Sequence, residues 1–172
     1  NQHFPQVSIN LYSGKDWMTD HLDQWSQEEA RITGEKPIIL PLLDPLLDAT
    51  KPLHKLLLIG EAEEIQALYR AISTDDFPST AFYLSKANYL EVTAKHVSKE
   101  DALVELANHY HLSLEEVLTM GDNFNDLPML KKAGIGVAMG NAPQDVKEGA
   151  AVVTKTNNEN GAGQAVETYV LI

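Results

Sequence analysis

The sequence predicts an α/β fold, with a parallel sheet in its later part and an α+β segment before it. From Lys99 onward, helical and strand patterns alternate with short joins, which is typical of a parallel α/β sheet. Before Thr93 the pattern is less regular and ends in a hairpin. With 44% hydrophobic side chains, the 172 residues can build a core. We therefore expect two segments, residues 1–95 and 96–172.

The first segment opens with a strand and a helix. Apolar residues alternate with polar ones at Val7, Ile9 and Leu11, and this period of two predicts a strand. We expect a helix to begin near Thr19 and Asp20 and to carry Leu22 and Trp25. Residues 36–52 contain four prolines, which favour an irregular connection over a regular element.

The remainder of the first segment predicts a strand, a helix and a hairpin. A strand at Lys55–Ile59 leads into a helix with one apolar face, made of Ile65, Leu68, Tyr69 and Ile72. Two further apolar runs, at residues 81–84 and 89–93, flank a short polar stretch and predict a hairpin.

The second segment predicts four helices and three strands. Ser98 is a favoured helix N-cap residue, and the helix after it carries Leu103, Leu106, Ala107 and Tyr110 on one face. We expect strands at residues 117–120, 135–139 and 151–153. The other helices are expected at residues 126–133, 141–149 and 161–171.

Composition excludes several classes of protein. The net charge is -12, without a Lys/Arg stripe, so nucleic acid is not an expected partner. No apolar run approaches the roughly 20 residues of a membrane helix, so we expect no membrane partner and a cytoplasmic location. Because there are no cysteines, any metal must bind through oxygen or imidazole.

The most informative stretch is Gly121-Asp122-Asn123-Phe124-Asn125-Asp126, which follows a predicted strand and precedes a predicted helix. Ligands of open α/β sheets bind at the carboxyl ends of strands, where these polar groups lie. Two carboxylates four residues apart supply hard oxygen ligands suited to Mg²⁺. A simple helix N-cap is the alternative, because Asp and Asn are favoured there.

The pattern continues as Leu-Pro-Met-Leu-Lys-Lys-Ala-Gly-Ile-Gly-Val-Ala-Met-Gly-Asn-Ala at residues 127–142. It resembles the last motif of Cof-type phosphatases in the haloacid dehalogenase-like (HAD) superfamily, where GDxxND or GDxxxND precedes ML-x-x-AG-x-GVAMGNA. The resemblance extends through Val146-Lys147 and Asn160-Gly161. Upstream, Val97-Ser98-Lys99 followed by Ala102-Leu103 looks like the family's S-K-G-x-A-L segment, with Glu100 in place of its glycine.

The resemblance implies a Rossmann-like core and a role for each matching residue. Lys99 would bind the substrate phosphate, and Asp122 would be a Mg²⁺ ligand. Asn125 would orient the phosphate or the metal shell, while Asp126 would support the metal through water or the lysine. Asn141 would contact the site from the next loop. Residues 1–95 would be the cap inserted between the two halves of the core, which selects the leaving group of a small phosphorylated metabolite.

The family's nucleophile, an aspartate in a D-x-D-G-T context, is absent from these 172 residues. The resemblance therefore implies the C-terminal portion of a phosphatase, inactive alone. Alternatives are a truncated, non-catalytic binding protein with a HAD-like half-site, and a response-regulator-like domain, which would need an early acidic cluster. Because the neighbouring nucleophile strand would be missing, we expect the strand at residues 117–120 to be an exposed edge that favours a homo-oligomer.

Overall fold

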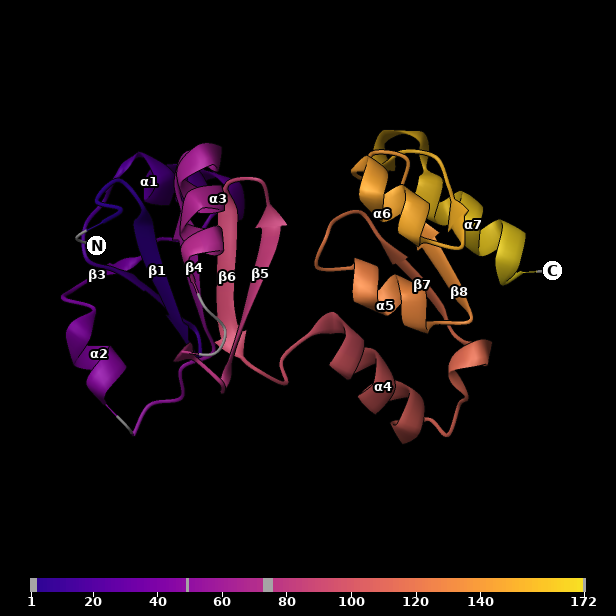
Figure 1. Cartoon of the computed structure of the whole chain (residues 1–172), viewed down its shortest axis with the longest axis horizontal. Coiled ribbons are helices and arrows are strands. Elements are labelled where there is room, and N and C mark those ends of the chain that lie inside the picture. Colours follow the sequence, from indigo (N-terminus) through magenta and orange to yellow (C-terminus); the bar gives the residue numbers. More distant parts are fainter. Residues whose placement is uncertain (1–2, 49, 73–75, 172) are drawn as a thin grey trace. The chain divides into compact units, whose positions relative to one another are not determined.

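The computed structural model of the chain describes residues 3–48, 50–72 and 76–171. The chain divides into two compact units, Asn1–Lys95 and His96–Ile172, each with its own sheet (Figure 1). Among the described residues no helix is long and apolar enough to cross a membrane.

The first unit is a six-stranded mixed sheet with the order β3-β2-β1-β4-β6-β5. Its strands are β1 (Ser8–Ser13), β2 (Asp16–Thr19), β3 (Ile38–Ile39), β4 (Lys55–Ile59), β5 (Thr80–Lys86) and β6 (Tyr89–Ala94). All neighbouring pairs are antiparallel except β2 and β3. The predicted hairpin at the end of this segment is confirmed as β5–β6.

Helices cover both faces of this sheet: α1 (Gln24–Thr33) lies on one face and α3 (Ala62–Ala71) on the other. The strands β2 and β4 run in the same direction. From β2 the chain passes through α1 to β3 at one edge of the sheet, and from β4 it passes through α3 to β5 at the other edge. Because such crossovers are right-handed, the two helices lie on opposite faces. Trp25 of α1 packs against a cluster that contains Tyr89, whereas Ile65 of α3 belongs to a cluster with the next residue, Leu90. Adjacent strand residues point to opposite faces, which agrees with this arrangement.

Two predictions for the first unit are wrong. The helix that carries Trp25 begins at Gln24, so Leu22 lies before it and is exposed. Thr19 instead ends β2, and its hydroxyl donates to the carbonyl of Ile9 at 3.1 Å. Both Trp17 and Met18 are buried because helices or loops cover both faces of β2, so its sequence lacks the alternation that reveals a strand. The connection at residues 36–52 also contains β3 and a short helix, α2 (Leu43–Leu47).

The second unit is the predicted parallel α/β layer. Its sheet has the order β7-β8-β9, formed by β7 (Leu118–Gly121), β8 (Ile135–Ala138) and β9 (Val152–Val153). The helices are α4 (Lys99–His109), α5 (Leu127–Lys132), α6 (Gln144–Gly149) and α7 (Gly161–Tyr169) (Figure 1). Two 3₁₀ turns, η2 (Leu114–Glu116) and η3 (Asn157–Glu159), complete the unit. The α/β fold class and the order of these elements are confirmed.

Packing around α5 forms the core of the second unit. The buried cluster contains Leu130, Ala138, Ala142 and Val146, which come from α5, the end of β8, the following loop and α6. On α4 only half of the predicted apolar face is buried: Leu103 and Ala107 are inside, whereas Leu106 and Tyr110 are exposed. Within the described residues, β7 pairs with β8 alone and so lies at an edge of this sheet.

Candidate functional site

The candidate site lies at the carboxyl end of β7, in the loop that leads into α5. Asp126 is the N-cap residue of α5 and is only 3% exposed. Its Oδ2 atom accepts hydrogen bonds from the backbone N–H groups of Asp122 at 2.9 Å and Asn123 at 3.0 Å. The buried carboxylate thus folds the whole loop back on itself, which sets the position of Asp122.

Gly121 makes this close fold possible. A Cβ atom at this position would lie 2.3 Å from the Cβ of Asp126 and 2.9 Å from its Oδ2. No side chain tolerates such distances without movement of the buried carboxylate. The glycine at the end of β7 is therefore required by the approach of Asp126, not by an unusual backbone conformation.

Lys99 supplies the positive charge of the site. It is the first residue of α4, which Ser98 caps by accepting a hydrogen bond from the backbone N–H of Asp101 at 2.9 Å. The Lys99 ammonium donates to Oδ1 of Asp126. The side chain of Lys99 is 50% exposed, whereas that of Asp126 is 4% exposed. Since an ammonium has three N–H donors, the arrangement leaves donors directed at solvent that can bind an anion.

Asp122 and Asn141 join the ends of two neighbouring strands. Oδ2 of Asp122, after β7, accepts a hydrogen bond from Nδ2 of Asn141, after β8, at 3.1 Å. The Asn141 amide is held in turn, because its Oδ1 accepts from the backbone N–H of Asn157 at 3.0 Å. Both Asp122 and Asn141 are exposed. A carboxylate oriented in this way at the surface is available to a cation or a substrate.

The structure thus brings together Lys99, Asp122, Asp126 and Asn141, four of the five predicted site residues. Asn125 lies half-buried in the same turn, between the two aspartates. Sequence reasoning did not identify the contribution of Asn157, which acts through its backbone N–H. The sequence shows only that Asn157 lies in an Asn-rich loop, and such loops also occur where there is no functional site.

The donors present fit Mg²⁺ in part. Mg²⁺ binds to one or two carboxylates and completes its shell with water and phosphate, and the exposed Asp122 carboxylate suits this. The two oxygens of Asp126 already accept hydrogen bonds from Lys99, Asp122 and Asn123, so Asp126 suits a supporting position. Across the described ranges no cluster of three or more His, Asp and Glu side chains could hold a metal by itself.

Comparison with known proteins decides the family. The sequence profile of the haloacid dehalogenase-like hydrolases matches residues 1–166. The chain belongs to this family. A putative phosphatase of Haemophilus influenzae is 39% identical over 164 residues, which cover 95% of this chain and 60% of that protein. A 5-amino-6-(5-phospho-D-ribitylamino)uracil phosphatase of Bacillus subtilis is 42% identical over 87 residues, covering 51% of this chain and 35% of that enzyme.

Solved structures of HAD-like hydrolases agree with this assignment. A haloacid dehalogenase-like hydrolase from Bacteroides thetaiotaomicron superposes with a TM-score of 0.76 at 33% sequence identity. The match covers 94% of this chain and 60% of that one. The chain therefore spans 60% or less of the length of these HAD relatives. The Cof-type resemblance of the Gly121–Asp126 motif is confirmed at the level of the family and the fold.

Proposed function

We propose that the chain supplies the cap and the later half of the core of a Mg²⁺-dependent phosphatase. Its substrates would be small phosphorylated metabolites resembling sugar phosphates, and its nucleophilic aspartate would lie outside these 172 residues. The observation that carries the proposal is the Lys99–Asp126 pair beside Asp122 at the carboxyl end of β7. Two curated relatives named as phosphatases support it, and one of them acts on a phosphorylated ribityl compound according to its name.

In this proposal Lys99 binds the phosphoryl oxygens of the substrate. A phosphoryl group in transfer carries negative charge on its equatorial oxygens, which a fixed cation stabilises. The carboxylate of Asp126 accepts a hydrogen bond from this ammonium, and because the carboxylate is buried, it fixes the position of the ammonium. Asn125 orients the phosphate from the same turn. An aspartate outside these 172 residues would attack the substrate's phosphorus and displace the substrate's alcohol group, which forms an aspartyl-phosphate.

Asp122 would hold Mg²⁺ through its carboxylate, and Asn141 would keep that carboxylate in position. When bound, the metal neutralises charge on the phosphate. Residues 1–95 would act as the cap that selects the leaving group, and residues 96–172 as the later half of the core. A second copy of the chain would associate through the β7 edge.

Binding of inorganic phosphate tests the proposal on the chain as it exists. We expect titration of the ¹⁵N-labelled chain at constant ionic strength to shift the backbone amides of Asp122 and Asn123 saturably. Lys99→Gln should remove this effect, whereas Lys131→Gln, which removes one charge from the exposed end of α5, should retain it. Saturable binding that Lys99→Gln leaves unchanged would contradict the phosphate role of Lys99.

A further inference from the structure

Glu100 follows the phosphate-binding candidate Lys99 directly and occupies the position where the Cof-type pattern has glycine. A carboxylate is favourable in the first turn of α4, because the helix dipole is positive there. The same carboxylate would repel a phosphate held by Lys99. The structure shows where this charge is directed: Oε1 of Glu100 accepts a hydrogen bond from the ammonium of Lys132 at 2.8 Å.

The two consecutive residues of α4 contact opposite ends of α5. Lys99 reaches Asp126, the N-cap residue of α5, and Glu100 reaches Lys132, its last residue. The six residues of α5 rise by roughly 9 Å, so the residue that pairs with Glu100 lies at the opposite end of this helix from Asp126. The ammonium of Lys99 and the carboxylate of Glu100, which are adjacent in sequence, therefore have different partners on α5.

We propose that Lys132 is a positioning residue for the phosphate site, which neutralises Glu100 and holds its carboxylate away from the anion bound by Lys99. This inference rests on the proposed phosphate role of Lys99. The pKa of Lys132 is raised by its hydrogen bond to Glu100, and further by the charges of Glu100 and Asp101. The ammonium therefore remains protonated, and able to neutralise Glu100, throughout the neutral range.

The magnitude follows from Coulomb's law. Removal of Lys132 leaves an unpaired carboxylate next to Lys99 in sequence. For two unit charges separated by about 8 Å, at an effective dielectric constant of about 40, Coulomb repulsion weakens binding about fivefold. Both partners are partly exposed, with 42% of the Lys132 side chain and 35% of the Glu100 side chain accessible. Exposed ion pairs contribute little to folding, so the variants should remain folded.

A structural brace and an electrostatic shield predict different results. If the pair only braced α4 against α5, Glu100→Gln and Lys132→Gln would weaken phosphate binding equally. If Lys132 shields the site from Glu100, Lys132→Gln weakens binding, whereas Glu100→Gln leaves it unchanged or strengthens it. The double variant E100Q/K132Q should then restore the affinity of the unaltered chain, because the repelling charge is gone.

The experiment is the titration of the ¹⁵N-labelled chain and these variants with inorganic phosphate at constant ionic strength. We expect the dissociation constant to rise about fivefold for Lys132→Gln and to return in the double variant. Lys131→Gln is the matched control, because the Lys131 side chain approaches Gly149 instead. It should change the constant by less than Lys132→Gln does.

Each outcome decides the inference. Equal weakening by both single variants, or a double variant as weak as Lys132→Gln, would overturn the shielding role while leaving the phosphate site intact. If Lys131→Gln weakens binding as much as Lys132→Gln does, the effect comes from the net charge of the chain, and the shielding role is also overturned. If the unaltered chain shows no saturable shift, the proposed phosphate site fails, and the shielding role fails with it.

Discussion

Asp126 has the most demanding position of any charged residue in the site. Its carboxylate is buried, and its oxygens accept from one ammonium and two backbone N–H groups. Burial of a charge is unfavourable unless hydrogen bonds and an opposite charge compensate it, and here both are present. The same side chain therefore shapes the loop and orients Lys99.

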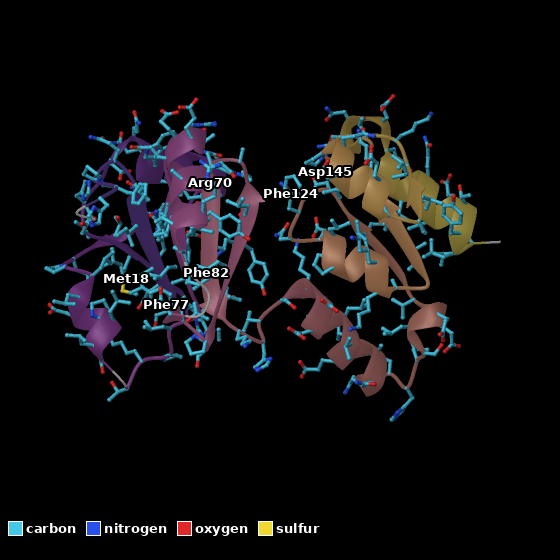
Figure 2. All side chains as sticks on the ribbon, in the orientation of Figure 1. Met18, Arg70, Phe77, Phe82, Phe124 and Asp145 are labelled. Atoms are coloured by element: carbon cyan, nitrogen blue, oxygen red, sulfur yellow. The ribbon has the colours of Figure 1, made fainter. Side chains whose placement is uncertain are left out.

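Replacement of this carboxylate by an amide should destabilise the second unit. Asp126→Asn directs an NH₂ group at N–H donors or at Lys99, so we expect the free energy of unfolding to fall by about 1–3 kcal/mol. Urea denaturation measures this change. The control is Asp145→Asn, which alters an exposed carboxylate on α6 (Figure 2) and should have little effect. Equal destabilisation by the two variants would contradict the role given to Asp126.

At the scale of elements, the site is made by the ends of two adjacent parallel strands. The loop after β7 provides Asp122, and the loop after β8 provides Asn141. These two side chains meet because the last residues of the strands, Gly121 and Ala138, are paired in the sheet. The exposed ring of Phe124 projects from the β7–α5 loop (Figure 2). Asp122 is the exposed carboxylate that this arrangement orients, so the site offers a metal few protein ligands.

Mg²⁺ should therefore bind weakly to this chain. Asp122 provides only part of a six-oxygen shell, so we expect affinity no tighter than about millimolar, comparable with the weakest calcium sites of proteins. Calorimetry should detect no micromolar site. Asp122→Asn should abolish whatever binding is observed, and Asp145→Asn should retain it. A micromolar site would require ligands beyond Asp122 and would contradict this description.

The second unit could be predicted closely from the sequence, whereas parts of the first could not. Its helices and strands follow clear caps and apolar patterns, as at Ser98, the N-cap residue of α4, and at Ile135–Ala138, which form β8. The strand β2 escaped prediction because Trp17 and Met18 are both buried, on opposite faces. The motif identified the site's side chains, but not the pairing of Glu100 with Lys132, which depends on how α4 crosses α5.

At the scale of the whole molecule, association is the first expected property. The strand β7 has one partner strand among the described residues, and its four residues include neither the lysine nor the proline that protects natural sheet edges. We predict a homo-oligomer, most simply a two-fold dimer through this edge. Light scattering at micromolar concentration measures it. A strictly monomeric, well-folded chain would show that the edge is covered by other means.

Catalysis is the second property, and we predict none for the chain alone. It lacks the D-x-D-G-T aspartate that forms the covalent intermediate in HAD phosphatases, so the remaining half-site binds without turnover. Hydrolysis of a generic aryl phosphate with Mg²⁺ should equal a protein-free blank. Turnover that Asp122→Asn abolishes would mean that another carboxylate of this chain is the nucleophile.

The most direct measurement of the central claim is a crystal structure of the chain soaked with tungstate, a tetrahedral oxyanion that anomalous scattering locates unambiguously. We predict a tungstate ion within hydrogen-bonding distance, about 3 Å, of the Lys99 ammonium and beside the Asp122–Asp126 loop. Tungstate bound elsewhere, with the Lys99 site empty at saturating concentration, would contradict the assignment of this loop as a phosphate site.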